Sequence, residues 1–157
     1  MGTWNVLTLS DDDRLPVLSA ELSRLGVEVA ALSEVRRPGS GSISEGGYTF
    51  YWSGSPGGER CRGVAVAVSN RLAASIVRVA AVDERIMVAR LRHTVGFLSL
   101  VAVYAPTEVK DLKELQWLTA LGLCEVLEIE SCWVLVPASG SASLVLDLQC
   151  GQCREGA

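Results

Sequence analysis

The segment Val27–Val35 constrains the fold most, because it is a short, almost continuously apolar run. A run of this kind, preceded by Gly26 and followed by charged residues, is typical of a strand buried on both faces of a sheet. Thr3–Leu9 is a second β-prone run, and a helical pattern lies between the two. A strand–helix–strand unit places its two strands in parallel. The start of the chain therefore predicts an α/β fold.

The helix between these strands is predicted from leucines at helical spacing, which form one apolar face: Leu15, Leu18, Leu22 and Leu25. The segment Ser10–Asp13 offers side-chain oxygens for the helix N-terminus and the negative charge favoured in a first turn. Gly26 follows the last leucine, at the position where a glycine commonly ends a helix.

Further along the chain, short β-prone runs alternate with turn residues. The predicted strands are Tyr48–Ser53, Gly63–Ser69, Ile76–Val82, Ile86–Leu91 and Phe97–Tyr104. The first two are expected to pair antiparallel across a glycine-rich turn, and Arg92–Thr94 to connect a hairpin. A glycine- and serine-rich loop is predicted over 36–47, and a second helix over Lys110–Leu121.

The composition excludes several classes of protein. The chain has 157 residues, of which 49% are hydrophobic and 20% charged, as expected of one globular domain. Its net charge of −4 argues against sequence-independent coating of nucleic acid, but it permits local contact with DNA. The longest apolar run is too short to span a membrane, and no secretory signal is visible. Five irregularly spaced cysteines favour reduced thiols in an intracellular protein.

The pattern changes near Gly122. Beyond it, glutamates are mixed among apolar residues, and Ser139–Ser143 is of low complexity. We therefore divide the chain into an organised part, 1–121, and a divergent tail, 122–157, which is expected to be poorly ordered.

Three polar side chains lie within or at the end of otherwise buried strands, namely Asn5, Glu34 and Tyr104. Strand ends on a rigid sheet are where α/β folds place ligand-binding groups. A carboxylate there can hold Mg²⁺, and a neighbouring amide and phenol can bind a phosphate oxygen. The alternative is structural: Asn5 completes a turn, Glu34 pairs with Arg36 or Arg37, and Tyr104 is a core ring.

Several short strings occur in order along residues 2–107, and their combination is more specific than any one of them. They are Gly2-Thr-Trp-Asn-Val6, Leu32-Ser-Glu-Val-Arg36, Gly46-Gly-Tyr-Thr-Phe-Tyr-Trp-Ser-Gly54, Gly63-Val-Ala-Val-Ala-Val-Ser69 and Val103-Tyr-Ala-Pro-Thr107. In these strings the chain resembles the endonuclease/exonuclease/phosphatase family, which has the DNase I-like fold. Within that family it is most similar to the endonucleases of LINE-type retrotransposons.

The resemblance implies an α/β sandwich of two sheets, here C-terminally truncated, and Mg²⁺-dependent hydrolysis of a phosphodiester in DNA. By the same analogy, Glu34 would be the metal ligand, Asn5 would orient the phosphate or the catalytic network, and Tyr104 would contact the phosphate. A DNA substrate would imply a nuclear location.

Two motifs of the family are absent from this sequence. After the Tyr-Ala-Pro strand the family supplies Gly-Asp-x-Asn at the end of the next core strand, and near its end it carries an Asp-His pair. Neither occurs here, and the single histidine, His93, has no neighbouring aspartate. Because loss of a proton-transfer group costs about 10²–10⁴ in rate, we expect catalysis to be severely impaired.

Other functions remain open at this stage. The alternative to an enzyme is a non-catalytic module that binds nucleic acid or protein, and a third possibility is an unstable remnant without a role. Cys150 and Cys153 could form a redox pair or half a zinc site, but no second pair follows them, which favours ordinary thiols in the tail. Loop arginines at 36, 37, 60 and 62 could contact a nucleic-acid backbone or simply be solvated.

Overall fold

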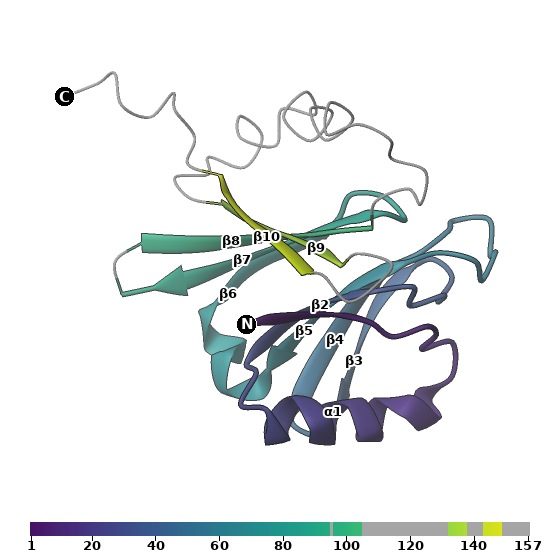
Figure 1. The fold of residues 1–157 in the computed structure, drawn as a ribbon, viewed down its shortest axis with the longest axis horizontal. Helices are drawn as coiled ribbons and strands as arrows, with labels where there is room; N and C mark the ends of the chain where they lie inside the picture. The colour runs from purple at the N-terminus through teal and green to yellow at the C-terminus, as the bar shows by residue number, and fades with distance from the viewer. Residues whose placement is uncertain (95, 105–131, 138–142, 149–157) are drawn as a thin grey trace.

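The computed structural model describes residues 1–94, 96–104, 132–137 and 143–148, and for the last two segments it describes the backbone only. Two sheets face each other and one helix covers the outer face of the first (Figure 1). The first sheet has the order β1-β2-β5-β4-β3 and the second β10-β9-β8-β7-β6. This architecture confirms the predicted α/β fold with two sheets.

The first sheet contains β1 (Gly2–Asn5), β2 (Val29–Ser33), β3 (Ser40–Glu45), β4 (Tyr48–Ser53) and β5 (Val64–Ser69). As predicted, β1 and β2 are parallel, and β4 and β5 pair antiparallel. The second sheet contains β6 (Ile76–Ala81), β7 (Ile86–His93), β8 (Gly96–Val103), β9 (Cys132–Pro137) and β10 (Ser143–Leu148). A 3₁₀ helix, η2 (Asn70–Ser75), connects the two sheets.

The helix α1 (Leu15–Arg24) packs its apolar face on the first sheet. Leu15 and Leu22 are fully buried against it, and Gly26 follows the helix at φ 64°, as the predicted terminating glycine. The helix start differs from the prediction, because a 3₁₀ turn, η1 (Asp12–Arg14), precedes α1 and no side chain caps either. The Asp12 carboxylate instead pairs with Arg37.

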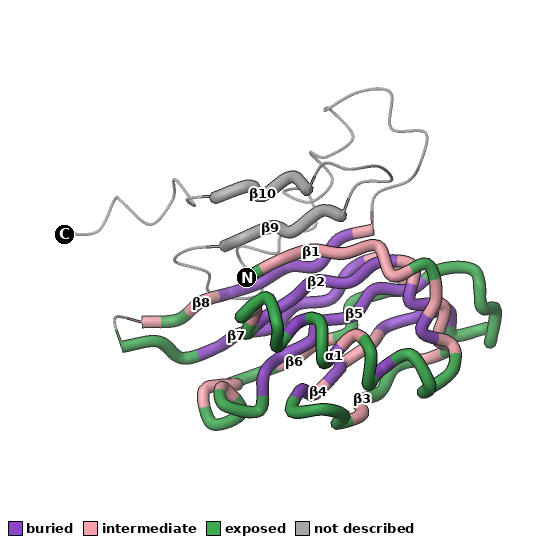
Figure 2. The backbone as a smooth tube through the Cα atoms, turned by 60° about the horizontal axis from the view of Figure 1, so that its bottom comes forward, coloured by how far each residue is buried: buried purple, intermediate pink, exposed green. Residues whose placement is uncertain are grey.

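A second core lies between the two sheets. Alternate residues of β2 and β5 point toward β7 and β8, and they form one buried cluster with them: Val29, Ala31, Val64, Val66, Val68, Met87, Ala89, Leu91, Leu100 and Ala102. Among the residues whose burial is described, the strands that carry this cluster are the most buried (Figure 2). Since β2 and β5 bury both faces, their continuously apolar sequences are explained.

One predicted loop is wrong in part, because the segment 36–47 contains strand β3. This strand lies at the edge of the first sheet, and only Ile43 is half-buried in it, so its sequence shows no apolar alternation. Gly41 allows the ring of Trp52 on β4 to lie against its backbone, where an added Cβ would come 2.5 Å from the ring. The pairing with β4 therefore determines this strand, and its own side chains give little signal.

Two further predictions concern the end of the chain. The predicted helix Lys110–Leu121 lies outside the described residues. The strands β9 and β10 fall within the predicted tail, 122–157, and β9 pairs parallel with β8. In the part of the chain that the structure describes, no helix is long and apolar enough to cross a membrane.

Candidate phosphodiester-binding site

The strands β1, β2 and β8 run in the same direction across the molecule, so their ends lie along one side of it (Figures 1 and 2). We call the described segments at this side the rim; they are residues 5–14, 34–39, 54–63, 82–85 and Tyr104. One hydrogen bond joins the two sheets at the rim: the Ser53 hydroxyl, at the end of β4, donates to the Asp83 carbonyl at 2.5 Å. Within the second sheet, the Tyr104 amide donates to the Arg85 carbonyl at 2.8 Å.

Asn5 and Glu34, at the ends of β1 and β2, are in direct contact. The Asn5 Nδ2 donates to Glu34 Oε1 at 2.8 Å, and the Asn5 Oδ1 accepts from the Leu7 amide at 3.0 Å. The parallel register, which pairs Asn5 with Ser33, brings the two side chains together. The second Asn5 contact also fits the turn expected from the structural alternative, so this amide both ends the strand and orients the carboxylate.

The Glu34 carboxylate has a second partner. Its Oε2 accepts from Arg36 Nη2 at 3.1 Å, and the side chain is 15% exposed. The ion pair that the structural alternative expects is therefore present, on the oxygen that Asn5 does not use. Glu34 adopts a left-handed backbone at φ 57° and Arg36 at φ 56°. Such conformations cost about 1–3 kcal/mol in residues other than glycine and concentrate at functional sites.

Tyr104 directly follows β8 and belongs to the same rim, on the other sheet. Its ring is half-buried against the core between the sheets, and the Arg85 guanidinium lies 5.6 Å from the ring centroid. The same guanidinium donates to the Tyr104 carbonyl at 3.2 Å. Arg85, which directly precedes β7, therefore contacts both the ring and the backbone of Tyr104. No described contact joins Tyr104 to Asn5 or Glu34.

Three further rim arginines, Arg37, Arg60 and Arg62, pair with carboxylates. Arg37 pairs with Asp12 and lies 4.9 Å from the centroid of the Trp52 ring. Arg62 pairs with Glu84 at 2.5 Å, and this hydrogen bond holds the pKa of Glu84 below its ordinary value. Most of the charged side chains named here are therefore paired with one another, as the alternative of solvated loop charges expects. His93, in contrast, is exposed near the β7–β8 turn, as expected.

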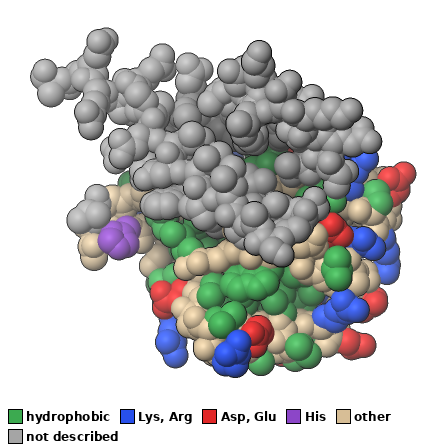
Figure 3. Space-filling view, in the orientation of Figure 1, with side chains coloured by type: hydrophobic (Ala, Val, Ile, Leu, Met, Phe, Trp, Pro, Cys, Tyr) green, Lys and Arg blue, Asp and Glu red, His purple; other side chains and the backbone are tan. Residues whose placement is uncertain are grey.

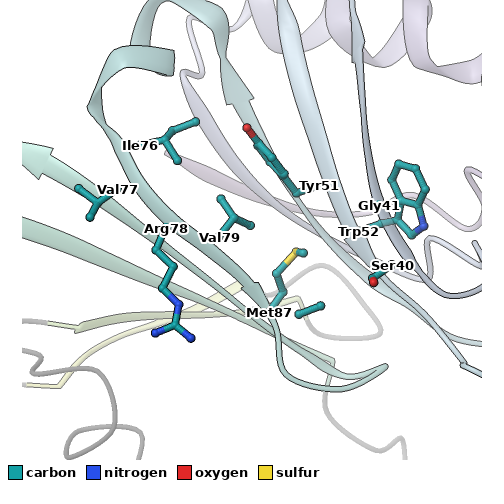
Figure 4. A pocket seen from close by; sticks show the side chains of 10 residues that line it. Ser40, Gly41, Tyr51, Trp52, Ile76, Val77, Arg78, Val79 and Met87 are labelled. Atoms are coloured by element: carbon teal, nitrogen blue, oxygen red, sulfur yellow. The ribbon is translucent and has the colours of Figure 1, made fainter.

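Pockets of the described residues include two that bear on this site or on the gap between the sheets. One of about 420 Å³ borders Asn5 and is lined mainly by apolar residues of β1 and α1: Trp4, Val6, Leu9, Val17 and Leu18. Figure 3 shows hydrophobic side chains gathered on one face of the molecule. Among the residues that line this pocket, Val17 is an exposed hydrophobic side chain. The other, of about 400 Å³, opens between the edges of the sheets, where Tyr51, Ile76, Val79 and Met87 face the gap (Figure 4). Neither pocket brings together the groups needed for acid–base chemistry.

The two facing mixed sheets, with β1 and β2 parallel, form a DNase I-like fold. No family model matches the chain. Among curated proteins it is similar to craniofacial development protein 2 of Bos taurus, at 28% identity over 107 residues, and to that of Tragulus javanicus, at 27%. Each match covers 68% of this chain but 18% of the relative, so the chain spans less than a fifth of these proteins.

Solved structures of DNA-processing proteins share the fold. An AP endonuclease from Leishmania major has a TM-score of 0.58 at 15% identity, with 85% of this chain and 53% of that structure covered. The endonuclease domain of the non-LTR retrotransposon TRAS1 has 0.54 at 16%, with 86% and 57% covered. The 3′ phosphatase NExo from Neisseria, bound to a DNA hairpin, has 0.50 at 19%, with 87% and 58% covered. These similarities confirm the fold and the resemblance predicted from the motifs.

Proposed function

We propose that this chain binds a phosphodiester of DNA at the rim, with Mg²⁺ held by Glu34, and that it hydrolyses the bond slowly or not at all. The observation that carries the proposal is the Asn5–Glu34 hydrogen bond, which fixes one carboxylate at the ends of two parallel strands. Tyr104, on the same rim, would contact the phosphate. Asn5 acts as a positioning residue. Its Nδ2 donates to the Glu34 carboxylate, and its Oδ1 accepts a hydrogen bond from the Leu7 amide in the turn that follows β1.

The rim offers a magnesium ion one carboxylate ligand, that of Glu34. Within the described segments, no three His, Cys, Asp or Glu side chains cluster to hold a metal. Mg²⁺, however, is commonly bound through one or two carboxylates and keeps several waters, so the partly exposed Glu34 suffices as its protein ligand. When bound there, Mg²⁺ would polarise a phosphoryl oxygen and offset the negative charge that develops on it.

Slow hydrolysis follows from the groups that the sequence does not supply. β9 is the strand next to β8, and the residues after Pro137, Ala138 to Ser141, include no carboxylate or amide side chain. The related family carries Asp and Asn after that core strand, where they activate water and stabilise the transition state. Binding of the phosphate is thus retained in this proposal, while proton transfer is not. A DNA substrate also implies a nuclear location.

The proposal is tested by nicking of supercoiled plasmid and by oligonucleotide binding, each with Mg²⁺ or with EDTA. The wild-type chain and Glu34→Gln are compared with Arg24→Gln, which removes a charge from an exposed ion pair on α1. We expect Mg²⁺-dependent binding that Glu34→Gln abolishes, with little nicking. Binding that is insensitive to both EDTA and Glu34→Gln would favour the non-catalytic binding module. Nicking that requires both Mg²⁺ and Glu34 would overturn the inference of impairment.

A further inference from the structure

Arg36 neutralises the same carboxylate that is the candidate metal ligand. Its Nη2 lies 3.1 Å from Glu34 Oε2, while Asn5 uses Oε1. The Glu34 side chain is 15% exposed, so little solvent is available to compensate its charge. A partly buried carboxylate of this kind requires a nearby cation, which Arg36 now supplies.

The Arg36 guanidinium is incompletely satisfied where it lies. Its Nε is buried and has no hydrogen-bond partner among the described residues. A guanidinium carries five N–H donors, and burying one without a partner costs free energy. This cost lowers the free energy needed to move the guanidinium away from Glu34.

The backbone between the two charges is anchored, so any exchange of partners involves side chains only. Val35 is buried; its amide donates to the Gly63 carbonyl at 3.1 Å, and its carbonyl accepts from the Leu9 amide at 2.8 Å. The Arg36 side chain, by contrast, is 42% exposed and can reach the rim solvent. Arg37 is only 12% exposed and is fixed by Asp12 and Trp52, which excludes it from the same role.

We propose that Arg36 is an internal counter-cation of Glu34, which a divalent cation displaces, and that the displaced guanidinium then binds the phosphate. This inference rests on the proposed metal and phosphodiester site. Cation and guanidinium compete for one oxygen, so Arg36 weakens metal binding when no phosphate is present. Once phosphate is bound, the guanidinium has a new partner, and the competition is relieved. Metal and phosphate therefore bind with positive coupling, each strengthening the other equally.

The test measures Mg²⁺ binding by calorimetry, with and without a short single-stranded oligodeoxynucleotide, on the whole chain. Arg36→Gln is compared with wild type, with Arg36→Lys and with Arg24→Gln, which frees an exposed glutamate on α1 and matches the change in net charge. Without oligonucleotide, Arg36→Gln is expected to bind Mg²⁺ about fivefold or more tightly than wild type, and the coupling to the oligonucleotide to fall by the same factor. Arg36→Lys keeps the cation and is expected to stay close to wild type.

The outcomes separate this inference from the proposed function. If Arg36→Gln binds Mg²⁺ no more tightly than Arg24→Gln does, the counter-cation role is wrong, even where Glu34→Gln abolishes metal binding. If Glu34→Gln binds Mg²⁺ as wild type does, the metal site itself is wrong. Circular dichroism spectra and melting curves for each variant establish that the comparison is made between folded chains.

Discussion

The Asn5 amide donates to one oxygen of Glu34 at 2.8 Å and joins the ends of two parallel strands. This contact depends on the register of β1 against β2, which a shift of one residue would break. Since the other carboxylate oxygen accepts from Arg36, Glu34 is held by one neutral and one charged donor. The predictions below test this arrangement and the rim that surrounds it.

Replacing Asn5 by Asp should destabilise the chain. A second carboxylate would lie within hydrogen-bond distance of Glu34, and like charges this close repel. We expect a loss of about 1–3 kcal/mol in unfolding free energy at pH 7. Urea unfolding of wild type, Asn5→Asp and Asn5→Ala at pH 7 measures the difference. An equal loss in both variants would show that charge repulsion is not its cause.

Because Glu34 has a left-handed backbone, replacing it by glycine should destabilise the chain less than replacing it by alanine, the reverse of the order in a helix. At φ 57° an alanine keeps the steric cost, whereas a glycine removes it, and both lose the carboxylate. Glu34→Gly should therefore be more stable than Glu34→Ala by about 1 kcal/mol in chemical denaturation. The control is position 20, in the middle of α1, where Ala20→Gly should lower stability by about 1 kcal/mol.

The ion pair between Arg62 and Glu84 should stabilise the rim above acid pH. The Arg62 hydrogen bond lowers the pKa of Glu84, so the stabilisation is fully present above the ordinary glutamate pKa of 4.5 and is lost as the pH falls through the lowered value. Arg62→Gln should reduce stability at pH 7 and have no effect at low pH, where Glu84 is protonated. Melting temperatures of both chains across this range provide the measurement. A constant difference across the range would contradict the assignment.

The close approach of two rim segments predicts that Gly54 tolerates no side chain. An added Cβ would lie 1.7 Å from the Arg37 carbonyl oxygen, and the Gly54 amide donates to the Gly39 carbonyl at 2.7 Å. Because backbone rather than a flexible side chain must move, we expect Gly54→Ala to cost about 1–3 kcal/mol or more. Gly57→Ala is the matched control, since its Cβ would meet only the Ser55 hydroxyl at 3.8 Å. Equal thermal stability of the two variants would contradict this reasoning.

The sequence by itself determined the buried strands of the first sheet and the helix that covers them, but not the edge strand β3. The apolar run Val27–Val35, the leucine spacing and the terminating Gly26 all appear in the structure, because burial of a strand on both faces and of one helix face leaves a periodic signal. The ordered motifs indicated the DNase I-like fold. The three candidate site residues were singled out because polar side chains are unusual at the ends of buried strands.

Only the tertiary structure decided how those residues are partnered. The Asn5–Glu34 bond joins residues 29 positions apart, and the β3–β4 pairing forms a strand from a segment with almost no apolar residues. The choice of Arg36 over Arg37 as the partner of Glu34 likewise depends on Trp52 and Asp12, which hold Arg37 elsewhere. Local sequence carries periodicity and turn chemistry, whereas contacts between distant residues exist only after the sheets have formed. The partners of Glu34 are therefore a property of the fold.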